Sequence, residues 1–408
     1  MSGNITDNPR DNTAGDSPQG GAAGESAAPP AQLNSLTGLR WIAACMVFFS
    51  HVAYVALPAT ETGQDIGTFV AMMGYVGVTT FFVLSGFVLT WSARAQDTRP
   101  KFWRRRFFKI YPNHFIGLLA GIAFMIWWGK DIGFPSFSDQ LPALLPQVLL
   151  VHTWIPDLEL AFSYNLVSWT LSVEAVFYLC FPFLLGAIRR IRPDRLWLWA
   201  GATVLVIFAV PQLARLLPAG EAGYEGLSNW QYWFIYVLPL SRMGEFVLGI
   251  LLARIVREKR WIDVPLWGAW LVFAAGYVVV LNAPKEYAIV ALGVLPVAVL
   301  IPAAAMADVR RRSSLLSGPV MVWLGNVSYA FYLLHFFAIQ VVLHIIGTDF
   351  RPTGLSSVGF VLASLVAGVL AAWALYALVE RPMMSRFATK RRPPEQPGTD
   401  RPAKAVRS

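Results

Sequence analysis

The chain has 408 residues, of which 56% are hydrophobic and only 14% are charged. This composition excludes a soluble globular enzyme and predicts a polytopic membrane protein. The formal net charge of +9 does not by itself indicate nucleic acid binding, because excess Lys and Arg collects in the cytoplasmic loops of membrane proteins.

The first 35 residues are rich in Gly, Ala, Ser, Pro, Asn and Asp and contain no apolar segment. They therefore predict a disordered N-terminal tail rather than a signal peptide or a packed domain. The chain has two cysteines, Cys45 and Cys180, and both fall inside apolar stretches. Neither a disulfide framework nor a metal site is expected.

About ten apolar stretches are long enough to cross a bilayer as helices. They run approximately over residues 37–57, 70–91, 113–129, 169–187, 196–213, 232–253, 265–281, 287–307, 320–346 and 356–379. The apolar stretch 141–154 is short, and we expect it to be re-entrant or interfacial. The sequence thus predicts an all-α membrane bundle over residues 36–383, followed by a basic, disordered tail over residues 384–408.

The positions of the charges predict the orientation of the bundle. If the stretch 141–154 does not cross, nearly all of the 33 Lys and Arg residues lie on the side shared by both termini. The exceptions are Lys130, Arg215, Lys285 and Arg351 on the opposite side and Arg242 inside the membrane. The positive-inside rule then places both termini in the cytoplasm of a multi-pass protein of the cell membrane.

The first apolar stretch, LTGLRWIAACMVFFSHVAYVAL, carries Arg40 near its start and His51 inside it. At a rise of 1.5 Å per residue the two side chains stand about 16 Å apart along one helix. An ionisable group at membrane depth is costly, which makes His51 a candidate functional residue. The alternative is a neutral imidazole that only hydrogen-bonds a neighbouring helix.

Glu174 lies in the stretch SWTLSVEAVFY (168–178). The helix rise per residue places it at a depth in the membrane similar to that of His51. A carboxylate beside an imidazole makes a general base that can deprotonate a hydroxyl, which is chemistry for acyl transfer. The alternative for Glu174 is a structural ion pair with Arg242. Arg242 also stands three residues before Glu245, so those two can form a local ion pair as readily as a substrate contact.

Two further stretches carry candidate residues. In VSYAFYLLH (327–335), His335 shares a helix face with Ser328, Phe331 and Tyr332, which can line a polar cavity or simply pack. The run KFWRRRFFKIYP (101–112) is the densest internal cationic cluster. It can anchor the chain at the cytoplasmic membrane surface or bind the phosphates and adenine of a nucleotide-bearing donor.

In combination these motifs resemble acyltransferase family 3, a family of integral-membrane O-acyltransferases, from about Leu36 to Pro382. The matching features are Arg40 and His51 with ten residues between them, FFVLSGF (81–87), the basic run ending in IYP, SWTLSVEAVFY, PLSRMGEFVLG, VSYAFYLLH and LVERP (378–382). Two features depart from the family pattern. Lys109 replaces an arginine, and the proline usually found before the tryptophan of the fourth span is absent.

The resemblance implies a cytoplasmic acyl-CoA donor, most simply acetyl-CoA, a pore through the bundle, and acylation of a hydroxyl, usually on a carbohydrate. It implies His51 as catalytic base and Glu174 as the acidic residue of the site, which we expect to orient His51. Donor-binding positions are Arg40, Arg106 and Lys109, and no metal is implied. We expect the acceptor to be bound by residues of the motif helices, namely Trp169, Ser172, Tyr178, Arg242, Glu245, Tyr332 and His335.

Two questions stay open at this point. Tyr332 and Ser172 are both candidates to stabilise the oxyanion, and no spacing argument selects one of them. A transporter or flippase of a lipid-linked sugar would also place ionisable groups inside the membrane, although it gives no use for the basic run. The acceptor is expected to be compact, such as a macrolide-like glycoside or a single envelope sugar, because the inferred outer loops are short.

Overall fold

A computed structural model describes residues 32–57, 60–94, 97–128, 137–220, 223–348, 350 and 353–388. Within these residues the chain forms helices and no strands. The long helices are α1 (Asn34–Ala56), α2 (Glu61–Trp91), α3 (Arg99–Trp127), α6 (Trp169–Arg189), α7 (Leu196–Ala214), α9 (Pro239–Arg257), α10 (Leu266–Asn282), α12 (Ala291–Val309), α13 (Pro319–Ile346) and α14 (Leu355–Leu375). Shorter helices are α4 (Phe137–Val148), α5 (Leu158–Ala161), α8 (Asn229–Tyr232), α11 (Lys285–Ala288) and α15 (Arg381–Met383).

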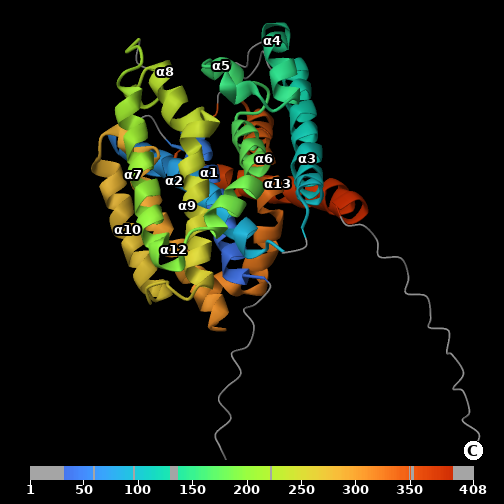
Figure 1. Cartoon of the computed structure of the whole chain (residues 1–408). Helices are drawn as coiled ribbons and strands as arrows, with labels where there is room; N and C mark the ends of the chain where they lie inside the picture. The colour runs from blue at the N-terminus through green and yellow to red at the C-terminus, as the bar shows by residue number, and fades with distance from the viewer. Residues whose placement is uncertain are drawn as a thin grey trace, which may run out of the picture.

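The expected membrane bundle is confirmed. In the described part of the chain, 9 helices or helix runs are long and apolar enough to cross a membrane, and α10, with 17 residues, is a shorter apolar helix. The 12 residues of α4 rise only about 18 Å, which is too short to span. Figure 1 shows α4, α5 and α8 together at one end of the bundle.

Three helix starts differ from the expected spans. Helix α2 begins at Glu61 because Thr60 caps it, with the Gly63 amide donating to the threonine hydroxyl (3.1 Å). Helix α3 begins at Arg99, so the basic run is the first half of a membrane helix rather than a separate surface segment. The span expected over 232–253 is broken before Pro239, because a residue that precedes proline is pushed out of the helical region.

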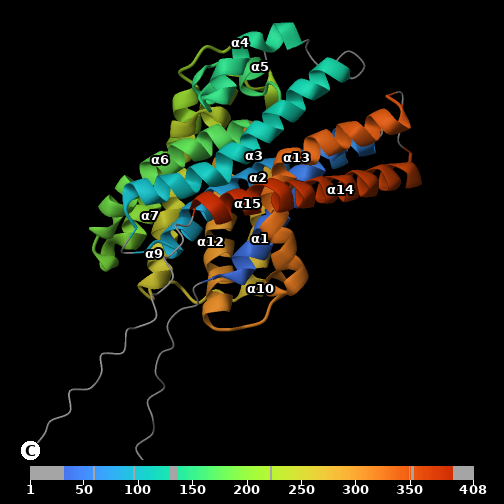
Figure 2. The same cartoon turned by 90° about the vertical axis from the view of Figure 1, so that its right-hand side faces the viewer.

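Helix α2 lies at the centre of the packing, between α1 and α9. A Cβ at Gly86 would collide with the carbonyl oxygen of Phe246, and one at Gly249 with that of Val83. Small residues let membrane helices approach this closely. Helices α7, α9, α10 and α12 gather on one side of the bundle (Figure 1), while α13 and α14 run side by side elsewhere (Figure 2).

The segment between α3 and α6 is held by a buried glutamine. The side chain of Gln147 donates to the Ser163 carbonyl (3.0 Å) and accepts from the Ser168 hydroxyl (3.2 Å). Its backbone carbonyl lies 2.8 Å from Nε2 of His114 on α3. Non-helical backbone is tolerated near a membrane when its polar groups are paired inside the protein, so this network lets the segment cap the bundle.

Most of the two expected tails lies outside the described residues. Lys130 and Arg351, two of the cations expected on the outer side, also lie outside them. Helix α1 begins inside the expected N-terminal tail, at Asn34. At the other end the helical turn Met384–Ala388 continues past the expected boundary at residue 383.

Candidate active site

His51 on α1 and His335 on α13 form a direct pair. Nδ1 of His51 lies 2.8 Å from Nε2 of His335, and the two rings are nearly parallel, with an interplanar angle of 18°. Nδ1 of His335 lies 2.6 Å from the backbone carbonyl oxygen of Tyr332. His335 is fully buried, whereas His51 borders a cavity.

The cavity beside His51, called here the outer cavity, has a volume of about 190 Å³. Its walls are largely aromatic, and they are contributed by α1, α2, α6, α13 and the segments before α6 and α9. The aromatic residues are Tyr54, Tyr75, Phe162, Trp169, Tyr224, Tyr232, Tyr236 and Tyr332. Aromatic rings with polar edges suit a sugar or another ligand that has both apolar faces and hydroxyl groups.

A second cavity of about 100 Å³, the inner cavity, holds the expected donor-binding cations. Arg40, Arg106 and Lys109 line it together with Glu174, the one carboxylate among the described residues that line this cavity. Glu174 interacts with the charges of the three cations and with the Tyr178 hydroxyl. The cluster therefore has an excess of positive charge, which an anionic ligand would neutralise.

Arg106 lacks a complete set of partners. Its guanidinium lies 5.5 Å from the ring centre of Phe102 and 5.6 Å from that of Tyr178. Its Nε is buried and has no hydrogen-bond partner among the described residues. A buried donor without a partner is costly, so Arg106 is a favourable place for an anionic oxygen to bind.

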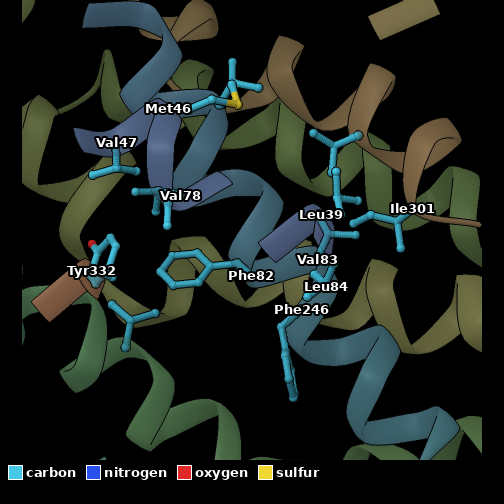
Figure 3. Packing of buried hydrophobic residues seen from close by; sticks show 14 of the residues in the cluster. Leu39, Met46, Val47, Val78, Phe82, Val83, Leu84, Phe246, Ile301 and Tyr332 are labelled. Atoms are coloured by element: carbon cyan, nitrogen blue, oxygen red, sulfur yellow. The ribbon is translucent and has the colours of Figure 1, made fainter. Parts of the chain in front are cut away.

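The two cavities meet at Val78 and Tyr332, which line both. Figure 3 shows Val78 close to Tyr332, with the ring of Phe82 facing the tyrosine. The Tyr332 hydroxyl accepts a hydrogen bond from Thr170 (3.1 Å). Tyr332 therefore stands at the junction between the cationic cluster and the histidine pair.

A third and wider cavity of about 600 Å³, the basic vestibule, adjoins the inner cavity through Leu89 and Arg106. Its other basic residues are Arg94, Arg99, Lys101, Arg104, Arg105 and Arg189. Arg105 is held by a two-pronged salt bridge to Asp97, at 2.7 and 3.0 Å. The basic vestibule, the inner cavity and the outer cavity thus follow one another through the bundle.

The structure brings most of the expected site residues to the inner and outer cavities. Arg40, Arg106, Lys109, Glu174 and Tyr178 come together in the inner cavity, His51 and Trp169 line the outer one, and Tyr332 lines both. His335 contacts the ring of His51 but lines none of the three cavities. The remaining expected contacts, Ser172, Arg242 and Glu245, line none of the three cavities.

Those remaining residues have structural partners instead. Ser172 donates to the Leu150 carbonyl (2.6 Å) and thereby anchors the segment that precedes α6. Arg242 and Glu245 form a fully buried ion pair, with Nε and Oε2 2.6 Å apart. The alternative of a local ion pair is therefore the one observed for Arg242 and Glu245, and the expected substrate contacts of Ser172, Arg242 and Glu245 stay predictions.

The expected pairing of Glu174 with His51 is not observed in the structure. The two residues line different cavities, and the ring of His51 contacts His335. Sequence reasoning singled out His335 but not as the partner of His51, because 284 positions separate the two. The available signal was that both histidines lie inside apolar spans.

The chain is similar in sequence to known acyltransferases. Residues 33–377 match the model of the acyltransferase domain family. The acyltransferase MdmB of Streptomyces mycarofaciens is 38% identical, over 92% of this chain and 98% of that protein. The exopolysaccharide production protein ExoZ of Rhizobium meliloti is 27% identical, over 78% of this chain and 92% of ExoZ.

A more distant relative is longer than this chain. The peptidoglycan O-acetyltransferase OatA of Listeria monocytogenes is 22% identical, over 74% of this chain and 48% of OatA. The chain therefore spans about half the length of that relative. No solved structure matches the chain significantly.

Proposed function

The chain belongs to the acyltransferase domain family and is a multi-pass membrane acyltransferase, and from this premise we propose that it transfers a short acyl group from acyl-CoA to a sugar hydroxyl. The transporter alternative is set aside by the family membership. The observation that carries the proposal is the series of three cavities, with cations at one end and His51 at the other. We place both termini and the basic vestibule on the cytoplasmic side of the cell membrane, as the distribution of Lys and Arg indicates.

The basic vestibule and the inner cavity suit the coenzyme part of the donor. Coenzyme A carries phosphates, and arginine recognises phosphate with a planar, two-pronged set of donors. The Nε of Arg106, which has no hydrogen-bond partner within the described part of the chain, offers one such donor. Lys109 keeps the charge but acts as a point charge, because an ammonium group lacks that fork.

The outer cavity suits a small acceptor. At about 190 Å³ it lies below the range of roughly 300–1,000 Å³ that is usual for drug-sized ligands. A single sugar unit or one edge of a compact glycoside fits this volume better than an extended polymer. OatA and ExoZ are named for peptidoglycan and exopolysaccharide, which supports a carbohydrate acceptor, most simply an envelope sugar or a macrolide-like glycoside.

The proposed reaction needs one proton transfer in each direction. His51 takes the proton from the acceptor hydroxyl, whose oxygen forms a bond to the carbonyl carbon of the thioester. The carbon–sulfur bond then breaks, and His51 returns the proton to the departing sulfur, so the products are an ester and a free thiol. Tyr332, at the junction of the two cavities, is placed to donate a hydrogen bond to the carbonyl oxygen.

The proposal is tested by mass spectrometry of membranes and culture extract from a strain that lacks this gene. The wild-type gene should restore one acyl mass increment on a small glycoside, whereas His51→Ala should not, because a general base contributes about 10²–10⁴ in rate. His344→Ala is a matched control, since His344 lies on a membrane helix and lines none of the three cavities. Restoration by His51→Ala at equal expression would overturn the role of His51. An increment found only on polymeric envelope sugar would overturn the compact acceptor.

A further inference from the structure

We infer that His335 is a positioning residue that fixes which ring nitrogen of His51 carries a hydrogen, and thereby leaves Nε2 of His51 unprotonated for the reaction. This inference rests on the proposed role of His51 as the base. It replaces the orienting role expected of Glu174, which lies in the other cavity. Three hydrogen-bonded groups decide where the hydrogen atoms lie, namely the Tyr332 carbonyl, His335 and His51.

The first of the three groups has a fixed hydrogen-bonding role. The backbone carbonyl of Tyr332 can only accept a hydrogen bond, and it lies 2.6 Å from Nδ1 of His335. The Phe331 carbonyl lies 3.3 Å from the same nitrogen. Nδ1 of His335 must therefore carry a hydrogen, because two acceptors face it.

The other nitrogen of His335 follows from burial. If Nε2 also carried a hydrogen, the ring would be a cation, and His335 is 0% exposed at membrane depth. A buried charge is costly unless an opposite charge compensates it, and its hydrogen-bond partners among the described residues are two backbone carbonyls and His51. Nε2 of His335 is therefore the acceptor.

The state of His51 is then determined. Its Nδ1 lies 2.8 Å from the accepting Nε2 of His335, so Nδ1 of His51 must donate. In a neutral imidazole the second nitrogen is an acceptor when the first is a donor. Nε2 of His51 is consequently free to take a proton from a hydroxyl in the outer cavity.

The surroundings hold His335 in this orientation. Its ring stacks on Phe331 at a centroid distance of 5.8 Å and meets the edge of Phe48 at 6.3 Å. Helices α1 and α13 also approach closely, since a Cβ at Gly325 would collide with the backbone of Thr37. The acceptor for His51 is thus part of a rigid helix contact, which fits a positioning role.

The test uses three variants of the full chain, purified in detergent. His335→Phe keeps an aromatic ring in the cluster but removes the acceptor, and His335→Gln restores an acceptor through its amide oxygen. His344→Phe is the matched control, because His344 lies on α13 like His335 and its ring contacts Trp128 (centroid distance 4.8 Å) and not the ring of His51. For each variant, kcat and KM are measured with acetyl-CoA and the glycoside identified by mass spectrometry, and ¹⁵N NMR of labelled histidine rings reports the protonated nitrogen.

We expect His335→Phe to lower kcat by about 10²-fold or more, within the range of general-base effects, with little change in either KM. His335→Gln should recover part of the loss, and His344→Phe should behave as wild type. The ¹⁵N shifts should show Nδ1 of His51 protonated in the wild type and a mixture in His335→Phe.

Two results would overturn the inference while leaving the proposed base intact. One is full activity of His335→Phe when His51→Ala is inactive, and the other is a wild-type His51 protonated at Nε2. If His51→Ala is itself active, the proposed base fails instead, so the two failures are distinguishable. Equal unfolding midpoints of wild type and His335→Phe exclude a loss of folding as the cause.

Discussion

Replacing Arg106 by alanine should weaken donor binding without slowing the chemical step. Arg106 lines both the basic vestibule and the inner cavity, and its buried Nε has no partner among the described residues. In the proposed complex this guanidinium binds a donor phosphate. Alanine removes the charge and its hydrogen bonds but leaves the reacting groups around His51 in place.

The size of the effect follows from the kind of bond that is lost. A hydrogen bond to a charged group contributes about 1.5–3 kcal/mol, and each 1.4 kcal/mol corresponds to a factor of ten. We therefore expect the KM for acyl-CoA to rise by about 10- to 150-fold. The lower end applies if water enters the open vestibule and hydrates the donor phosphate. The kcat at saturating donor should change little, because the lost contact is equally strong in the bound ground state and in the transition state.

The assay is steady-state acyl transfer with varied acetyl-CoA, together with calorimetric titration of the donor. The matched control is Arg190→Ala, which removes an exposed cation that lines none of the three cavities. The donor KM of the wild type should also rise with salt more steeply than that of Arg106→Ala, because salt screens the lost interaction. An unchanged donor affinity in Arg106→Ala would refute the reasoning and leave the basic run as an orientation signal only.

Glu245→Gln should lower the free energy of unfolding by about 3–5 kcal/mol, because it leaves the buried Arg242 cation unpaired. The double variant Arg242→Met with Glu245→Leu should be closer to wild type in stability. A loss of acceptor affinity at unchanged stability would contradict this structural role. Val78→Phe should fill the junction of the two cavities and reduce kcat by about tenfold or more, while calorimetry should find donor binding retained. Full activity would show that the reactants do not meet there. A single cysteine at position 190, in a variant without Cys45 and Cys180, should resist membrane-impermeant maleimide in intact cells and react after lysis. Labelling before lysis would reverse the proposed orientation.

The sequence alone determined the fold class and the approximate positions of the spans, and it singled out Arg40, Arg106 and Lys109, the three cations that line the inner cavity. These follow from it because a lipid-facing helix must be apolar over a fixed length, and because helix rise converts spacing along the chain into depth. The eleven-residue step from Arg40 to His51 separates them along α1, and the structure places them in different cavities. The start of α9 could also have been read from Pro239, since proline restricts the residue before it.

Only the tertiary structure decided which residues at a given depth meet. Depth fixes a position along the helix axis, but the neighbour of a side chain depends on the rotation of each helix and on which helices pack together. That is why Glu174 lies in the inner cavity, while His335, 284 positions from His51, contacts its ring. Arg242 and Glu245 could be recognised as a possible pair from their spacing, but only the packing around them, which leaves both fully buried, separates an ion pair from a substrate contact.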